Sequence, residues 1–286
     1  MNLQITPPQR RADGRLVLIT GATSGIGAAY ARVLAARGHD LWLTGRRMSV
    51  LEPQADEMRE RHGIHVTTQA VELGDEEELV ALEAAVREVP DLYGLINNAG
   101  YSDDGIFHLM TPAQHRRLMR VHMDATVQLA HAALPALEQQ RGLLINVASL
   151  ASWIPTAGSP LYGPTKGFVR LFTETLAMAY HDTEIRFQVL CPGFVVTDFH
   201  SRIGLDPETF YKNHGLTRAF PASWVVERSL RDLEKGRIVS SPGWHYKLLG
   251  LLIRHMPRRL LYRVLQLGMN RRYNIKGQVE KQQESR

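Results

Sequence analysis

The segment from Arg15 to Gly38, RLVLITGATSGIGAAYARVLAARG, constrains the fold of this chain more than any other stretch. Its apolar, β-branched run Leu16 to Ile19 predicts a buried strand, and Ala28 to Arg37 predicts a helix that ends at Gly38. Between them lies a turn that contains Gly21, Gly25 and Gly27. Strand, glycine turn and helix in this order are typical of a unit that binds a dinucleotide.

The rest of the chain repeats the alternation of strand and helix. Further strands are expected at 41–44, 65–71, 94–97, 143–147, 186–190 and 238–240, and helices at 76–89, 114–138 and 163–181. Continuous apolar strands that alternate with helices predict a parallel sheet covered on both faces. We therefore expect an α/β fold: a Rossmann-type, doubly wound parallel sheet in a single domain, with ligands outside the carboxyl ends of the strands.

Composition is consistent with one globular domain. The 286 residues are 44% hydrophobic and 22% charged, which suffices for one large core. The single cysteine, Cys191, excludes an internal disulfide framework, suits a reducing, cytoplasmic location, and is expected to be a small buried side chain. The first residues contain no apolar signal-peptide core, no apolar run reaches membrane-spanning length, and the 12 histidines form no metal-ligand spacing, so we expect no metal.

The glycine turn is the first candidate binding site. Glycines let the backbone approach a pyrophosphate closely, and the N-terminus of the following helix supplies free N–H groups and the positive end of its dipole. The candidate cofactor-binding residues of this turn are Gly21, Thr23, Ser24, Gly25, Ile26 and Gly27.

The segment SLASWIPTAGSPLYGPTK, from Ser149 to Lys166, carries a candidate catalytic set. Tyr162 and Lys166 are four positions apart, so on one helix they project from the same face. A phenol with a pKa of about 10 is a poor acid at neutral pH, and a neighbouring cation favours its phenolate. A substrate carbonyl oxygen could contact the tyrosine hydroxyl, and Ser149 would donate a hydrogen bond to the same oxygen.

Taken together, these motifs resemble the short-chain dehydrogenase/reductase family. The glycine spacing matches the family's T-G-x-x-x-G-x-G at Thr20 to Gly27, and the resemblance covers about Gly14 to Gly243. The other matches follow in order: Asn97-Asn98-Ala99-Gly100, Ser149 with Tyr162, Lys166, and Pro192-Gly193 with Thr197.

The resemblance implies reversible hydride transfer between a nicotinamide and a ketone or secondary alcohol. In the reductive direction Tyr162 would protonate the forming alkoxide and Ser149 would bind the substrate oxygen. Lys166 would hold the nicotinamide ribose and lower the pKa of the tyrosine. The family pattern also assigns cofactor contacts to Asn98, Ala99, Gly100, Pro192, Gly193 and Thr197.

The end of the second strand favours NADP. The run LTGRR places Gly45, Arg46 and Arg47 where an acidic residue would bind the ribose 2′-hydroxyl of NAD. Guanidinium groups there can instead pair with a 2′-phosphate, and in the family Arg46 takes the position that selects NADP. A solvated basic turn is the alternative. Glu72 stands where the family usually has an aspartate near the adenine.

His122 departs from the family pattern. Relatives have an asparagine here whose backbone carbonyl holds a water and links the lysine to a proton relay. His122 keeps a carbonyl, and its imidazole could itself carry protons near neutral pH. The alternative is a residue that fills a helix kink without any proton role.

The substrate loop is expected at about 198–220. An apolar pocket lined by Trp153, Ile154, Phe194, Phe199 and Phe210 would favour an aliphatic, aromatic or steroid-like ketone, although each of these side chains could equally belong to the core.

The chain divides into an N-terminal arm at 1–13, a catalytic domain at 14–243, and a basic extension at 244–286. Residues 244–273 hold one lysine, six arginines and no acidic residue, and their leucines lie near helical spacing, with Pro257 as a break. An amphipathic helix pair of this kind could lie on an anionic membrane surface. Alternatively its apolar face packs over the substrate cleft or a partner subunit. Nucleic-acid binding is not expected, because no stacking platform accompanies the arginines.

Two other functions are compatible with the motifs. The first is a nucleotide-binding regulatory or scaffold protein that lost turnover, which His122 and Glu72 would permit and the complete Ser-Tyr-Lys set argues against. The second is an epimerase or dehydratase, which the glycine spacing disfavours. Relatives commonly form homodimers or homotetramers through their two long helices.

Overall fold

The protein is represented by a computed structural model, which describes residues 5, 7, 8, 10, 11, 14–102, 107–155, 160–197, 215 and 218–269, with side chains to residue 266. The first half of the chain forms β1 (Leu16–Ile19), α1 (Gly25–Ala36), β2 (Asp40–Gly45), α2 (Met48–His62), β3 (Val66–Ala70), α3 (Glu76–Arg87), β4 (Leu92–Asn97), α4 (Pro112–Met119) and α5 (Ala125–Gln139). The second half forms β5 (Leu143–Val147), α6 (Tyr162–Ala179), β6 (Arg186–Leu190), β7 (Val195–Val196), β8 (Phe220–Pro221), α8 (Ala222–Glu234), β9 (Val239–Ser240), α9 (Trp244–His255) and α10 (Arg258–Met269).

A parallel sheet runs through the middle of the protein. Within the described residues it has seven strands in the order β3-β2-β1-β4-β5-β6-β9, and every pairing is parallel. The strand order reverses between β1 and β4, where the chain crosses from one half of the sheet to the other. This confirms the predicted α/β fold, and the reversal places the ligand-binding edge at the carboxyl ends of β1, β4 and β5.

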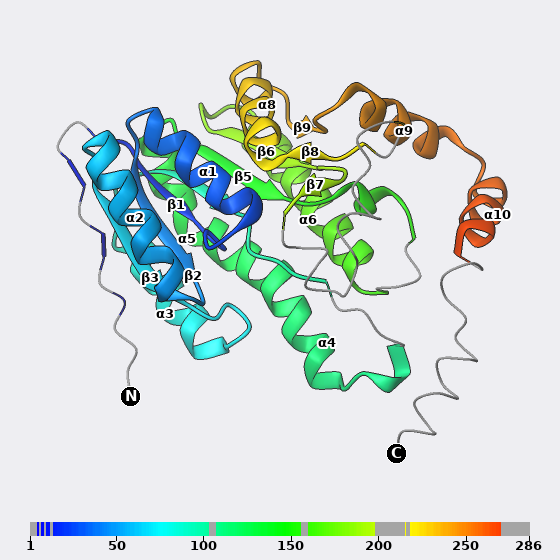
Figure 1. Ribbon diagram of the computed structural model, residues 1–286, viewed down its shortest axis with the longest axis horizontal. Coiled ribbons are helices and arrows are strands. Elements are labelled where there is room, and N and C mark those ends of the chain that lie inside the picture. Colours follow the sequence, from blue (N-terminus) through cyan, green and yellow to red (C-terminus); the bar gives the residue numbers. More distant parts are fainter. Residues whose placement is uncertain are drawn as a thin grey trace.

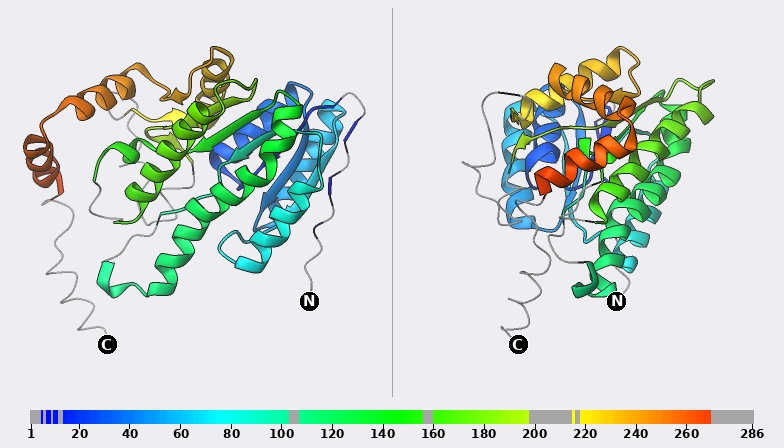
Figure 2. Two further views of the ribbon diagram at one scale, coloured as in Figure 1. Left: turned by 180° about the vertical axis from the view of Figure 1, so that it is seen from behind. Right: turned by 90° about the vertical axis from the view of Figure 1, so that its right-hand side faces the viewer.

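Helices cover both faces of the sheet (Figures 1 and 2). On one face α1 packs against α2 and α8, and on the other α5 packs against α3. Each face has its own apolar core, and strands β1, β2, β4 and β5 are buried along their whole length. Burial on both faces explains why these strands read as continuous apolar runs in the sequence.

The long helix expected at 114–138 is interrupted. Helix α4 begins with a capping box between Thr111 and Gln114 and with Pro112 in its first turn. A π-helical turn from Arg120 to Asp124 separates it from α5. Such π-turns often occur at functional sites, and this one contains His122.

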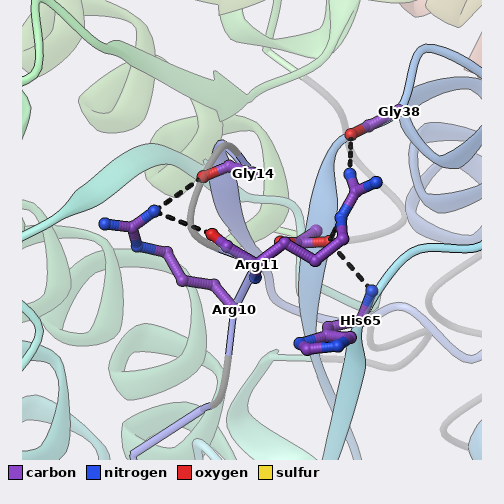
Figure 3. Close-up of polar contacts among 6 residues, drawn as sticks. Arg10, Arg11, Gly14, Gly38 and His65 are labelled. Atoms are coloured by element: carbon purple, nitrogen blue, oxygen red, sulfur yellow. Dashed lines mark hydrogen bonds and ion pairs between the residues drawn. The ribbon is translucent and has the colours of Figure 1, made fainter.

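Part of the N-terminal arm is fastened to β2 (Figure 3). The carboxylate of Asp40 is fully buried and accepts hydrogen bonds from the Arg11 backbone N–H (2.7 Å), the Arg11 guanidinium (2.9 Å) and the His65 N–H (2.8 Å). Arg10 donates to the carbonyl of Gly14 at 3.2 Å. A side chain at position 14 would collide with Asp40, because a Cβ there would lie 1.9 Å from its carboxylate oxygen. Burial raises the pKa of Asp40, but the bonds from Arg11 and His65 outweigh it and leave that pKa below its usual value.

Helix α9 is joined to the catalytic domain through Tyr246. This side chain is 1% exposed, and its hydroxyl donates to the Arg218 carbonyl at 2.6 Å and accepts from the Phe194 N–H at 3.0 Å. Its ring lies against Gly193, where a Cβ would come within 2.2 Å of it. Helix α10 continues beyond α9 at the end of the molecule away from α2 and α3 (Figure 1). Within the described ranges, no helix combines the length and apolar character needed to cross a bilayer.

Candidate active site

The glycine turn between β1 and α1 lies directly against the end of β4. Gly21 and Gly25 have positive φ angles of 66° and 59°, which favour glycine. Thr20 Oγ1 accepts the N–H groups of Asn98 (3.0 Å) and Ala99 (3.1 Å), and Asn98 Nδ2 donates to the carbonyls of Thr20 (2.9 Å) and Gly21 (3.1 Å). The turn and the Asn98 segment therefore form one rigid edge.

Close packing leaves no room for side chains at the glycine positions of this edge. A Cβ at Gly27 would lie 2.4 Å from the Asn98 amide nitrogen, and one at Gly45 would lie 2.7 Å from the Thr23 methyl group. The backbone at the N-terminus of α1 therefore stays bare, which fits the approach of a pyrophosphate. Thr197 also reaches this edge, because a Cβ at Gly25 would lie 3.2 Å from its Cγ2.

Glu72 joins two arginines beside the end of β2. Its carboxylate pairs with Arg46 at 3.4 Å and with Arg117 of α4 at 2.6 Å, and accepts the Gly74 N–H at 2.9 Å. Burial raises the pKa of Glu72, but the Gly74 N–H and the charges of Arg117 and Arg46 outweigh it, so the pKa is lowered and the group stays ionised. Arg47 is the N-cap residue of α2.

Ser149, Tyr162 and Lys166 meet at the carboxyl end of β5. Ser149 follows this strand and caps a short 3₁₀ turn at Leu150–Trp153, accepting the Ala151 N–H at 3.1 Å. Tyr162 begins α6, and the Lys166 ammonium lies 6.0 Å from its ring centre. The structure thus brings the three candidate catalytic side chains to one place.

Burial governs the electrostatics of this set. Lys166 is 5% exposed and donates to the Val147 carbonyl at 2.8 Å. Its burial lowers its pKa to about 8. Burial also raises the pKa of Tyr162, and the hydrogen bond with Ser149 opposes that rise only in part. This direction is opposite to the expected one, since the lysine was expected to bring the phenol toward neutral pH.

His122 is enclosed between α6 and the segment after β4. Its Nε2 accepts the Tyr101 N–H at 3.2 Å and its Nδ1 lies 2.8 Å from Thr165 Oγ1. Because a backbone N–H can only donate, Nε2 carries no proton and Nδ1 is the protonated nitrogen. Burial first, and then the charge of Lys166, lowers the pKa of His122 well below its usual value, so the ring is neutral. Its backbone carbonyl accepts the Thr126 hydroxyl at 2.8 Å.

Gly100 separates the imidazole from the ammonium. A Cβ at this position would lie 3.1 Å from both His122 Nε2 and Lys166 Nζ. Pro192 and Gly193 follow β6 at the same edge of the sheet. Cys191 is buried as expected, and burial raises the pKa of its thiol to about 12.

The predicted substrate loop lies almost entirely outside the described residues, and so do Phe199 and Phe210. Two guanidinium groups lie over the Trp153 ring, that of Arg170 at 3.8 Å and that of Arg254 at 5.4 Å from the ring centre. Phe194 donates its N–H to Tyr246. No group of three metal-ligating side chains gathers within the described ranges.

Several supporting residues were not assigned from the sequence. Thr20 belonged to a recognised motif, and its position before the first glycine was the available signal. Val147, Thr165 and Arg117 carried no such signal, since each acts through a contact with a distant residue. Arg117, for example, is 45 positions from Glu72.

Comparisons with known proteins decide the family. A sequence model described as short chain dehydrogenase matches residues 15–208. The chain belongs to the short-chain dehydrogenase family. This short-chain dehydrogenase is 36% identical over 196 residues to sulfoacetaldehyde reductase 2 of Chromohalobacter salexigens, covering 64% of this chain and 74% of that protein. It is 33% identical over 221 residues to an NADP-dependent 3-hydroxy acid dehydrogenase of Salmonella typhi, covering 74% and 86%.

A solved structure extends the similarity over most of the chain. The short-chain dehydrogenase from Sphingobium yanoikuyae in complex with NADPH has a TM-score of 0.75 and 29% identity, and covers 91% of this chain and 97% of that one. The family and the Rossmann-type fold predicted from the sequence are both confirmed. This short-chain dehydrogenase is accordingly an oxidoreductase that transfers a hydride between a nicotinamide cofactor and a C=O or CH–OH group.

Proposed function

We propose that this enzyme is an NADP(H)-dependent ketone reductase, or the same enzyme working as a secondary-alcohol dehydrogenase, that acts on an apolar substrate. The observation that carries the proposal is the meeting of Ser149, Tyr162 and Lys166 at the carboxyl end of β5, beside the bare glycine turn. When bound, the cofactor supplies or accepts the hydride.

The chain's own residues would handle the proton and the oxygen. Tyr162 would donate its phenolic proton to the forming alkoxide, and Ser149, already hydrogen-bonded with Tyr162, would donate a hydrogen bond to the same oxygen. The Lys166 ammonium has three donors, and its bond to Val147 uses one of them. Another of these donors would bind a ribose hydroxyl of the cofactor.

Selection of NADP is assigned to Arg46, with Arg47 as a second cation. Gly45 leaves the end of β2 without a side chain. Arg46 already lies beside Glu72, whose position in the family is near the adenine. A 2′-phosphate would replace the weak 3.4 Å contact to Glu72 with a charge-assisted pairing. The NADPH complex of the Sphingobium relative and the NADP-dependence of the Salmonella relative support this choice.

The complete set of Ser149, Tyr162 and Lys166 argues against a regulatory protein without turnover. A protein that only binds nucleotide could use Lys166 to hold the ribose. It has no chemical need for a phenol hydrogen-bonded with Ser149 at the same place, whereas catalysis has that need.

The partners follow from the family and the surface. We propose a homodimer or homotetramer through α5 and α6, since α6 exposes Leu171 and Met178, each 59% exposed. Light scattering of the purified protein measures its molar mass and therefore distinguishes a monomer from a dimer or tetramer. A cytoplasmic location suits the single buried cysteine.

The test is a titration followed by turnover. Purified protein is titrated with NADPH and with NADH, and a panel of aliphatic, aromatic and steroid ketones is then added while NADPH absorbance is followed. We expect tighter binding of NADPH and its oxidation with at least one ketone. Tyr162→Phe should lower kcat by at least about a thousandfold and leave the NADPH dissociation constant unchanged within about threefold.

Ser152→Ala is the matched control, because Ser152 lies on the 3₁₀ turn that Ser149 caps and has no assigned role in the reaction. It should keep most of the turnover. A Tyr162→Phe variant that retains most of its kcat would remove the proposed mechanism, and tighter binding of NADH would remove the role given to Arg46.

A further inference from the structure

Helix α9 presents an apolar stripe to solvent. Trp244, Leu248, Leu251 and Leu252 are 74%, 41%, 56% and 53% exposed. Their spacing places all four on one side of the helix. A continuous exposed stripe that includes a tryptophan differs from the scattered apolar residues of an ordinary surface.

The opposite side of α9 already packs on the protein. Tyr246 and Ile253 are buried, and Arg254 lies over the Trp153 ring at 5.4 Å. This side of α9 therefore packs on the rest of the protein through Tyr246 and Ile253. The exposed stripe is a second face, held in a fixed orientation by the first.

Helix α10 adds further exposed apolar and basic groups. Leu260 and Val264 are 51% and 50% exposed, Arg259 and Arg263 are exposed beside them, and Arg258 is exposed at the start of the helix. Lys247 is also exposed on α9, next to the stripe. From residue 235 to residue 279 the sequence contains no aspartate or glutamate.

We propose that the exposed apolar stripe of α9, together with the exposed basic residues of α9 and α10, binds the surface of an anionic lipid bilayer, with the four stripe residues inserted among the acyl chains. A tryptophan and leucines on one side of a helix with basic residues around them match the physics of interfacial helices. Basic side chains gain free energy beside anionic lipid headgroups, and that gain falls with added salt.

A second copy of this chain fits the surface less well. Two copies docked through this face would bring like charges together, with no acidic residue of the segment to compensate them. A membrane supplies both the apolar and the anionic component. Helix α9 packs against the 3₁₀ turn after Ser149, so the membrane-bound enzyme would hold that turn near the bilayer. If the proposed function holds, an apolar substrate would reach the active site directly from the lipid.

The experiment is co-sedimentation of the full-length protein with vesicles. One set is pure phosphatidylcholine and the other contains about 30% phosphatidylglycerol, each at low and high salt. We expect the protein to pellet with the anionic vesicles at low salt and to be largely released at high salt. Failure to pellet with anionic vesicles would overturn the proposal, and equal pelleting with both sets would overturn its electrostatic part.

Two variants separate the apolar from the charged contribution. Leu248→Ser/Leu251→Ser removes two stripe residues, and Lys247→Glu/Arg258→Glu reverses two charges. Each should lower the pelleted fraction at least about fivefold. The matched controls are Val80→Ser, an exposed apolar residue of α3, and Arg32→Glu/Arg61→Glu, two exposed arginines of α1 and α2, outside the α9 and α10 segment. These should pellet like the wild type.

Nucleotide binding and light scattering of every variant are measured in the absence of lipid. Unchanged NADPH affinity shows that a variant is folded, whatever its turnover. Loss of pelleting together with a smaller oligomer in the stripe variant would assign the face to a second copy and overturn the lipid proposal.

Discussion

Lys166 is an ammonium-bearing side chain enclosed by protein, with 5% of its surface exposed. Its pKa falls to about 8 in the folded state because burial disfavours the charged form. In the unfolded chain the pKa is about 10.4. Below pH 8 both states bind the proton and the full cost of burial is present. Between about pH 8 and 10.4 the unfolded state binds more protons, so the free energy of unfolding rises with pH.

Replacing this lysine should therefore stabilise the protein while removing activity. We expect Lys166→Met to raise the free energy of unfolding at pH 7 by about 1–3 kcal/mol, since a shift of one pKa unit corresponds to about 1.4 kcal/mol and the lost bond to Val147 offsets part of the gain. The gain should shrink as pH approaches 10. Thermal unfolding followed by circular dichroism at pH 7 and pH 9.5 measures both.

Lys235→Met is the control, because Lys235 is exposed at the end of α8 and should give no comparable gain. A Lys166→Met variant that melts below the wild type at pH 7 would show that the lysine stabilises the fold. It would contradict the prediction that Lys166 lowers the stability of the protein although activity requires it.

Individual site residues were predictable where a short motif fixes both spacing and backbone. Gly21, Gly27, Ser149 and Tyr162 were found in this way, because each belongs to a pattern a few residues long. The direction of the Tyr162 pKa was not predictable, since it depends on how deeply the folded protein encloses the phenol. Nor was the contact between Glu72 and Arg117, which only the packing of α4 brings about.

At the scale of elements, the π-helical turn at Arg120–Asp124 positions His122, whose ring contacts bear on the two hypotheses for its role. Both ring nitrogens already contact Tyr101 and Thr165, and the lowered pKa keeps the ring neutral. These contacts favour a positioning role without proton transfer. The His122 carbonyl accepts the Thr126 hydroxyl and, with two lone pairs, retains capacity for a water.

We accordingly expect His122→Asn to keep kcat within about tenfold of the wild type, since asparagine retains the backbone carbonyl. The pH dependence of kcat/KM should be unchanged between pH 6 and 9, because a neutral imidazole does not titrate there. The lost ring contacts should lower the free energy of unfolding by about 1–3 kcal/mol. Loss of a limb of the pH profile, or a fall of more than a hundredfold in kcat, would instead assign proton transfer to His122.

At the scale of the whole molecule, sequence periodicity predicted the parallel sheet because strands buried on both faces must be continuously apolar. It did not predict the break in the 114–138 helix, whose residues show no local helix-breaking signal before Pro135. The division at residue 243 also reflects composition rather than packing. The basic residues begin there, yet Tyr246 lies inside the domain against Gly193.

Two truncations distinguish an appended tail from an integral helix. A chain ending at residue 243 loses Tyr246, whose hydroxyl holds Arg218 and Phe194. Loss of one large buried aromatic costs about 3–5 kcal/mol, and in a domain of this size we expect a fall in Tm of roughly 10 °C together with weaker NADPH binding. A chain ending at residue 257 keeps α9. Among the described side chains of α10 that it loses, only Leu261 is buried.

The longer chain should therefore melt within a few degrees of the wild type and bind NADPH normally. Tyr246→Phe in the full chain keeps the ring and removes only the hydroxyl, so its loss of stability should be about 1 kcal/mol. If the chain ending at 243 melts like the full protein, α9 is a detachable extension. Because the orientation of its exposed stripe depends on Tyr246 and Ile253 being packed, α9 would then no longer be held as a fixed surface beside the turn after Ser149.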